Sequence, residues 1–439
     1  MISYFVNKLK KILPFVLFLI FFFSINSEPW KINIFLDKNS FNDYINYFRG
    51  ILPIISGFFI LFYVIINKKK IEIVDIVTII FFLYFLLQLL GLIINFPINE
   101  EDNFYYRIYF LFLLFFSISL FLSLKKNYFS KILILMIFLI LVINIYFLTT
   151  ATFEFFFIEK KPFYYSKIFQ AENTLLGSPS IRSTGLARIN LILFIFTLVY
   201  LEQIKKNYII FFIILNLLCI ILLQSRVNIY SIYFFLIFYL FFFKNIKIKE
   251  RIKFFIIFSC IPLLIYHSIK FNQFNQFDQS SSSIGIEANI KNNIIFNPSK
   301  HESISNFSTG RSEIWRDLLG SKKNFKQITF GFGTQADRIL TAPAYFSASN
   351  AYIYVFISSG IIGLITILSF LIFLIYRIGK LIFVNKIFSK NGNILLKFSI
   401  LLFTYLLIRS LVESSFAVYG IDYLFFILSS KIIILSTTH

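Results

Sequence analysis

Residues 350–377 read NAYIYVFISSGIIGLITILSFLIFLIYR, and the first charge in this run is Arg377 at its end. An α-helix rises about 1.5 Å per residue, so about 20 apolar residues cross the hydrocarbon core of a bilayer. The stretch is therefore long enough to form a transmembrane helix. The number of such stretches in the chain indicates the fold class.

Apolar stretches of this kind recur along the whole chain of 439 residues. The composition is 58% hydrophobic and 14% charged with a mean hydropathy of +0.80, whereas soluble domains have roughly 25% charged residues. The stretches lie near residues 10–25, 50–66, 72–95, 104–124, 129–149, 186–203, 207–224, 227–244, 252–269, 350–377, 395–411 and 416–436. We therefore expect an all-α integral membrane protein with about twelve transmembrane helices, folded as a single polytopic domain over residues 1–439.

The first apolar stretch has an alternative interpretation. It follows Lys8, Lys10 and Lys11, which is the arrangement of a secretory signal. No small-x-small cleavage site follows it convincingly, so we expect this helix to be retained.

The formal net charge of +21 is spread over short basic clusters between the apolar stretches. Short cytoplasmic loops of membrane proteins collect Lys and Arg. If twelve helices are threaded, one side receives the clusters at residues 8–11, 68–70, 125–126, 205–206, 244–253 and 377–397. We therefore expect both termini to be cytoplasmic, and the charge needs no nucleic acid to explain it.

Residues 270–349 form a long polar loop between the ninth and tenth predicted helices. Hydrocarbon cannot solvate exposed backbone or charge, so this loop must lie outside the bilayer core. The same threading places it on the non-cytoplasmic face, where we interpret it as a lid on the helices. Residues 150–185, on the same side, mix aromatic and charged side chains and are predicted to lie at the membrane interface.

Within the long loop, the sequence predicts a short helix from Arg311 to Leu319 that ends at Gly320. Thr309 or Ser308 can cap its start. Arg311 and Trp315 share one face of this helix at i,i+4 spacing. Further along, FGFGT at residues 330–334 is typical of a turn.

Several arginines fall on the non-cytoplasmic side, where the positive-inside rule does not account for them. They are Arg182, Arg188, Arg226, Arg311 and Arg316. Guanidinium groups bind phosphate oxygens bidentately and keep their charge at physiological pH, so converging arginines suit a diphosphate. Arg226 lies in a turn short enough to be near hydrocarbon depth, where an ionisable group indicates function. The alternative for Arg226, and for Arg188 or Arg316 taken alone, is a side chain that reaches to lipid headgroups.

Other chemistries have little support in the sequence. No H-E-x-x-H, Walker A, G-x-S-x-G or D-x-D motif is present. Cys219 and Cys260 both lie in apolar stretches, which argues against a disulfide framework or a cysteine metal site. We expect no metal and no cofactor.

Five segments appear in the order that is typical of one family of membrane proteins. They are RSTG at residues 182–185 leading to Asn190, Ser225-Arg226 at a helix start, GRSEIW at residues 310–315, GFG at residues 331–333, and Asn350 followed by GIIG at residues 360–363. In this order, and with the long loop before Asn350, the chain resembles the O-antigen ligase and O-antigen polymerase family over roughly residues 180–370.

The resemblance implies a metal-independent, inverting glycosyltransferase of a bacterial inner membrane. Its donor is an undecaprenyl-diphosphate-linked oligosaccharide at the periplasmic face, and its partners include membrane lipid and a chain-length regulator protein. Arg182 and Arg226 resemble the arginines that contact the diphosphate, and Arg311 resembles the loop arginine. These guanidinium groups would stabilise the negative charge that develops on the leaving oxygen.

The departures from the family favour a polymerase over a ligase. Ligases typically have a histidine before the asparagine, but Ser349 stands there, and serine near its ordinary pKa is no general base. Ser358 stands where an acidic residue is often found. The base therefore stays open between Glu313 and His301.

The predicted site has two parts, and two further functions remain as alternatives. The catalytic set is Arg311, Glu313, Ser349 and Asn350, and the diphosphate-binding set is Arg182, Arg226, Arg188 and Arg316. The first alternative is a ligase that transfers glycan to lipid A core or another acceptor. The second is a polysaccharide transporter or flippase without catalysis, which predicts repeats, interrupted helices and charges at mid-membrane. We find no repeat, and the chief buried charge in the sequence is Asp75.

Overall fold

The computed structural model describes residues 12–13, 15–16, 18–19, 51, 54–62, 75–95, 101–123, 126–153, 157, 183–201, 207–223, 225–242, 247–260, 311–321, 324–341, 347–385, 387–389 and 393–436. Within these ranges 90% of residues are helical and no strand is present. The predicted all-α class is confirmed. The interfacial segment 150–185, the first apolar stretch and residues 270–310 of the long loop fall mainly or wholly outside the described residues.

The long helices coincide with the predicted apolar stretches. They are α3 (Ile76–Ile94), α4 (Glu101–Ser123), α5 (Lys126–Phe153), α6 (Ser183–Leu201), α7 (Asn207–Leu222), α8 (Arg226–Phe242), α15 (Ala351–Gly379), α16 (Ile394–Ser410) and α17 (Ile421–Ser436). The long loop contributes the short helices α12 (Arg311–Gly320), α13 (Phe325–Phe330) and α14 (Ala336–Leu340). The predicted helix α12 and its end at Gly320 are confirmed, whereas its predicted caps, Ser308 and Thr309, lie outside the described residues.

Four of the described helices are long and apolar enough to cross a membrane. They span Ile76–Ile94, Tyr128–Phe153, Thr184–Leu201 and Ala351–Val384. Large apolar side chains are exposed along α15, among them Ile365, Ile372 and Ile375, as expected of a lipid-facing surface. These features are consistent with a multi-pass membrane protein, whereas the count of twelve helices and the sides of the loops stay predictions.

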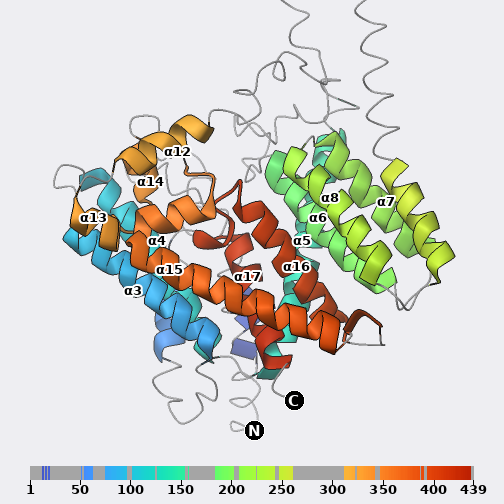
Figure 1. Cartoon of the computed structure of the whole chain (residues 1–439), viewed down its shortest axis with the longest axis horizontal. Helices are drawn as coiled ribbons and strands as arrows, with labels where there is room; N and C mark the ends of the chain where they lie inside the picture. The colour runs from blue at the N-terminus through green and yellow to red at the C-terminus, as the bar shows by residue number, and fades with distance from the viewer. Residues whose placement is uncertain are drawn as a thin grey trace, which may run out of the picture. The chain divides into compact units, whose positions relative to one another are not determined.

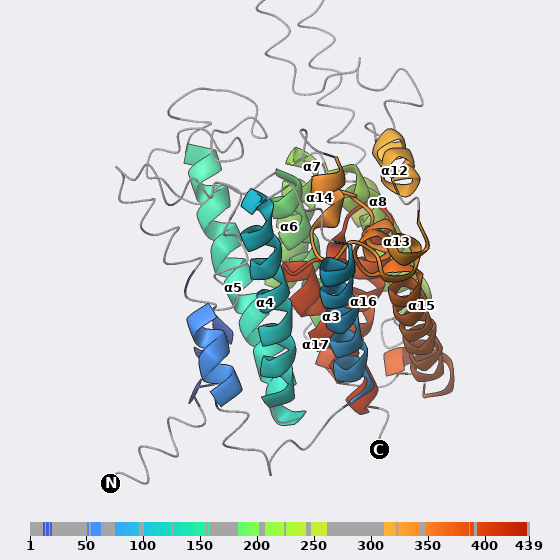
Figure 2. The same ribbon diagram turned by 90° about the vertical axis from the view of Figure 1, so that its left-hand side faces the viewer.

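The described chain divides into two compact units. Unit 1 comprises Met1–Ile134, Thr309–Lys380 and Phe403–His439, and unit 2 comprises Leu135–Ser308 and Leu381–Leu402. In unit 1, helix α3 packs along both α15 and α4 (Figures 1 and 2). In unit 2, helix α6 packs against α7 and α8, the yellow-green group in Figure 1.

Phe81 lies at the centre of the aromatic core of unit 1. Its buried ring packs edge-on against Tyr423, Phe426 and Phe370, with centroid distances of 5.4, 6.0 and 6.2 Å. Edge-to-face geometry suits the charge distribution of aromatic rings and adds to the free energy of burial. The contacts join α3, α15 and α17 into one body.

Helix α15 is interrupted inside its length at Gly360, whose φ of 68° and ψ of −168° are not helical. The break frees carbonyl groups that a continuous helix would use. Residues of the 331–333 turn replace the missing partners: Phe332 N–H donates to Ile357 O and Gly333 N–H to Ser358 O, each at 2.8 Å. Irregular backbone within an apolar body is tolerated only when its polar groups are paired in this way.

Glycines make this contact possible, and we call Gly91, Gly331, Gly333 and Gly360 the glycine crossing. A Cβ on Gly91 would lie 2.6 Å from Phe330 O, and a Cβ on Gly331 would lie 2.6 Å from Gly360 N. Only glycine lets two backbones approach this closely. The structure thus confirms the predicted turn at residues 330–334 and brings it against the GIIG segment.

A buried ion pair connects α3 to α17 in unit 1. Lys431 Nζ lies 3.0 Å from Asp75 Oδ2 and 2.7 Å from Thr78 Oγ1. The carboxylate of Asp75 also caps α3 by accepting from Thr78 N–H at 2.9 Å. The burial predicted for Asp75 is confirmed, and its partner lies 356 residues away in sequence.

Candidate functional site

The start of α15 is fixed by Asn350. Its Oδ1 accepts from the N–H groups of Tyr352 at 2.9 Å and Ile353 at 3.0 Å, which caps the helix. Its Nδ2 donates to Leu411 O, in the turn after α16, at 2.8 Å. The Asn350 side chain, predicted as catalytic, therefore holds two segments of unit 1 together.

Helices α12 and α14 both bond to the backbone of Ala348, just before α15. Trp315 Nε1–H donates to Ala348 O at 2.6 Å, and Ala348 N–H donates to Asp337 Oδ2 at 2.7 Å. The next residue, Ser349, has a φ of 47°, in the left-handed region that non-glycine residues rarely adopt. Hydrogen bonds on both sides of Ala348 hold this backbone in place.

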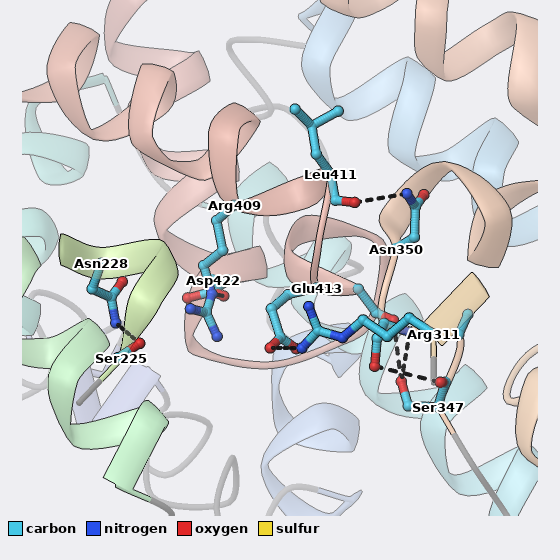
Figure 3. A network of polar contacts seen from close by, with 12 residues as sticks. Ser225, Asn228, Arg311, Ser347, Asn350, Arg409, Leu411, Glu413 and Asp422 are labelled. Carbon is cyan, nitrogen blue, oxygen red and sulfur yellow. Dashed lines mark hydrogen bonds and ion pairs between the residues drawn. The ribbon is translucent and has the colours of Figure 1, made fainter. Parts of the chain in front are cut away.

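Arg311 lies on the same side of α12 as Trp315, as the i,i+4 spacing predicts. Its Nη2 lies 3.3 Å from Glu413 Oε1, and the two side chains are 27% and 32% exposed. Close by, the hydroxyl groups of Ser347 and Ser414 lie 3.3 Å apart. We call Arg311, Trp315, Ala348, Asn350 and Glu413 the α15 entry cluster. Figure 3 shows Arg311, Asn350 and Glu413 of this cluster.

A second ion pair lies beside this cluster and is buried. Arg409 Nε is 2.9 Å from Asp422 Oδ2, with side-chain exposures of 7% and 4%. Neither residue was among the predicted site residues, although each is an ionisable group in a predicted membrane stretch, where such groups are uncommon and indicate a partner or a function.

Asp337 on α14 is a further carboxylate near the cluster that was not among the predicted site residues. It is buried, and its Oδ1 has no hydrogen-bond partner among the described residues. Burial raises the pKa of Asp337, while the hydrogen bond from Ala348 N–H and the charge of Arg338 oppose the rise. No sequence pattern marked this aspartate, because its surroundings are set by how the long loop folds back.

The raised pKa of Asp337 predicts a stability that depends on pH. A carboxyl whose pKa is higher in the folded state contributes stability below its unfolded pKa of about 3.9, and this is lost as pH rises through the folded pKa. We expect the Asp337→Asn variant, whose amide oxygen can still accept from Ala348 N–H, to lose less stability than wild type between acid and neutral pH. Thermal unfolding in detergent across this pH range measures the difference.

Asp317→Asn provides the control for this experiment, because it neutralises a carboxylate that is exposed to solvent. Its unfolding midpoint should follow wild type at every pH. A wild-type protein that gains stability over Asp337→Asn as pH rises would show instead that the buried carboxylate is favourably paired.

The other predicted site residues lie apart from the cluster or outside the described residues. Glu313 and Arg316 are exposed on α12, and Arg316 faces Asp317 at 3.9 Å. Glu313 lies in the first turn, where an acidic side chain favours the helix dipole. Arg182, His301 and the side chain of Arg226 are outside the described residues.

Unit 2 holds Arg188 and two residues of the family-like segments, Asn190 and Ser225. Arg188 is half-buried on α6, and Asn190 exchanges two hydrogen bonds with Asn144, at 2.8 and 3.2 Å. Ser225 accepts from Asn228 Nδ2 at 2.8 Å (Figure 3). The convergence of Arg182 and Arg226 with Arg311 stays a prediction.

No protein-family model, no curated protein and no solved structure matches the chain. Function must therefore be argued from the residues of the chain.

Proposed function

We propose that the chain is an O-antigen polymerase-like glycosyltransferase, which moves glycan from an undecaprenyl-diphosphate donor to a lipid-linked repeat unit at the periplasmic face. The observation that carries the proposal is the position of Arg311. A guanidinium group from the long polar loop lies at the start of a membrane-length helix, and α12 is anchored there by the Trp315–Ala348 hydrogen bond. The family-like order of the surrounding segments adds the substrate class.

The chemistry that this position suits is stabilisation of a leaving diphosphate. As the bond between the anomeric carbon and the phosphate oxygen breaks, negative charge develops on that oxygen, and the acceptor hydroxyl forms the new bond from the opposite face. A guanidinium group placed at the leaving oxygen lowers the barrier because it needs no reorganisation at the moment of reaction. The proton of the acceptor requires a base, and Asp337, which accepts a hydrogen bond from Ala348 N–H, is a carboxylate near this position.

The proposal predicts that Arg311→Lys loses turnover although it keeps the positive charge. Lysine cannot present two parallel N–H donors to phosphate oxygens, so we expect a fall of about 10²-fold or more in turnover, as for loss of one preorganised donor. Purified protein with undecaprenyl-diphosphate-linked repeat units provides the assay, through release of undecaprenyl diphosphate and formation of longer glycans. Arg377→Lys, at the other end of α15, is the matched control and should keep wild-type turnover.

A deletion strain separates the polymerase from the ligase. Lipopolysaccharide core that carries a single repeat unit indicates loss of a polymerase, whereas bare core with accumulated lipid-linked polymer indicates loss of a ligase. A surface polysaccharide that is unchanged in the deletion strain would exclude both.

The transporter alternative also gains a supporting observation. Transporters use interrupted membrane helices and buried charges, and unit 1 contains both, in the break of α15 at Gly360 and the Asp75–Lys431 pair. A transporter moves the lipid-linked glycan without cleaving it. Release of undecaprenyl diphosphate by the purified protein therefore decides between the two functions.

A further inference from the structure

Glu413 is paired with the guanidinium group of Arg311, which a diphosphate would also need. In the α15 entry cluster, Glu413 Oε1 accepts a hydrogen bond from Arg311 Nη2 at 3.3 Å. A carboxylate and a phosphate are alternative partners for one guanidinium fork. Any anion that binds Arg311 must therefore compete with Glu413.

The two ion pairs beside the start of α15 differ in how readily they can exchange partners. The Arg409–Asp422 pair is short, at 2.9 Å, and almost completely buried. Separating it would leave a charge without a partner in an apolar surrounding, which is costly. The Arg311–Glu413 pair is longer, has one contact and is about one third exposed. Water solvates both of its groups, so this pair contributes little net stability and can open.

The Glu413 carboxylate remains near a second positive charge, that of Arg409, when it separates from Arg311. Its backbone N–H donates to Arg409 O at 2.9 Å, which fixes its place in the turn after α16. The Arg409 guanidinium also attracts the Glu413 carboxylate electrostatically. Figure 3 shows Arg311 on one side of Glu413 and the Arg409–Asp422 pair on the other. The carboxylate can thus give up one arginine without becoming an isolated charge.

We propose that Arg311 is the centre of a diphosphate-binding site and that Glu413 is the internal anion that pairs with it when no ligand is bound. A diphosphate then binds by displacing the Glu413 carboxylate from the Arg311 guanidinium group. The inference rests on the proposed function for the identity of the lipid-linked donor. The recognised group itself is a pyrophosphate, whose several negative charges outcompete the single charge of a carboxylate. Glu413 then sets the affinity of the site rather than forming part of the reaction.

The chain contains its own reporter for this exchange. Trp315 lies one helical turn from Arg311 and bonds to Ala348 O, so its fluorescence responds to changes at the cluster. The sequence has two tryptophans, and Trp30→Phe leaves Trp315 as the single emitter. In this background the probe is inorganic pyrophosphate, titrated at constant ionic strength into the purified full-length protein.

Glu413→Gln is the decisive variant because glutamine keeps the size of the side chain and removes its charge. We expect pyrophosphate to bind this variant about tenfold more tightly than the parent, which is the effect of removing one charge-assisted competitor. Arg311→Gln should abolish the fluorescence response to pyrophosphate. Asp317→Asn removes the same charge from an exposed position on α12 and should leave the affinity unchanged.

Two results would overturn the inference: equal affinities for the parent and Glu413→Gln, or an equal gain in Asp317→Asn, which would reflect net charge alone. If Glu413→Gln does not fold, Glu413→Asp keeps the charge and shortens its reach, and tighter pyrophosphate binding is again expected. The assay also separates this inference from the proposed function. Tighter binding without release of undecaprenyl diphosphate from lipid-linked glycan refutes only the glycosyltransferase, whereas glycan synthesis with unchanged pyrophosphate affinity refutes only the role of Glu413.

Discussion

Replacing Gly360 by alanine is expected to prevent unit 1 from folding stably. The added Cβ would lie 2.1 Å from Thr329 O, a distance that no side-chain rotation can relieve because the obstacle is backbone. Alanine also strongly disfavours the φ of 68° and ψ of −168° that Gly360 adopts. Together these effects should lower the free energy of unfolding by about 3 kcal/mol or more. Thermal unfolding of the purified protein in detergent measures the loss.

The same helix contains a matched control for this experiment. A Cβ on Gly379, at the end of α15, meets no atom within 4 Å. Gly379→Ala should therefore fold as well as wild type or slightly better, because alanine favours the helix. If Gly360→Ala unfolds at the same temperature as Gly379→Ala, the close contact of α15 with the 331–333 turn is not required for the fold.

Replacing Lys431 by methionine is expected to destabilise unit 1 by about 3–5 kcal/mol, since it leaves the buried carboxylate of Asp75 without a counter-charge. Lys431 contributes the 3.0 Å contact to Asp75, and both side chains are almost completely buried. The double variant Asp75→Asn with Lys431→Met removes both charges and should recover most of the loss. Asparagine can still cap α3 in place of Asp75.

Unfolding of the single and double variants forms a double-mutant cycle that isolates the pair. Lys326→Met, an exposed position on α13, is the control for the loss of a lysine charge and should change stability little. A double variant as unstable as Lys431→Met would show that the lysine stabilises unit 1 by some means other than its pairing with Asp75.

The local parts of the structure could be predicted from the sequence. The described membrane-length helices match the predicted apolar stretches, because the length and composition of such a stretch decide whether it can cross hydrocarbon. The end of α12 could be predicted as well, since i,i+4 spacing and a terminal glycine act within a few residues. The placement of Arg311 and Trp315 on one face of α12 has the same local origin.

The partners of the polar groups were decided by tertiary structure. Arg311 pairs with Glu413, 102 residues away, and Lys431 pairs with Asp75, 356 residues away. Asn350 and Gly331-Phe332-Gly333 were recognisable as motifs, but their contacts with Leu411 and with the broken α15 were not. The physical reason is that a buried charge or a freed carbonyl must find a partner that is near in space. One sequence shows which groups need partners, and only the packing of the helices shows which groups supply them.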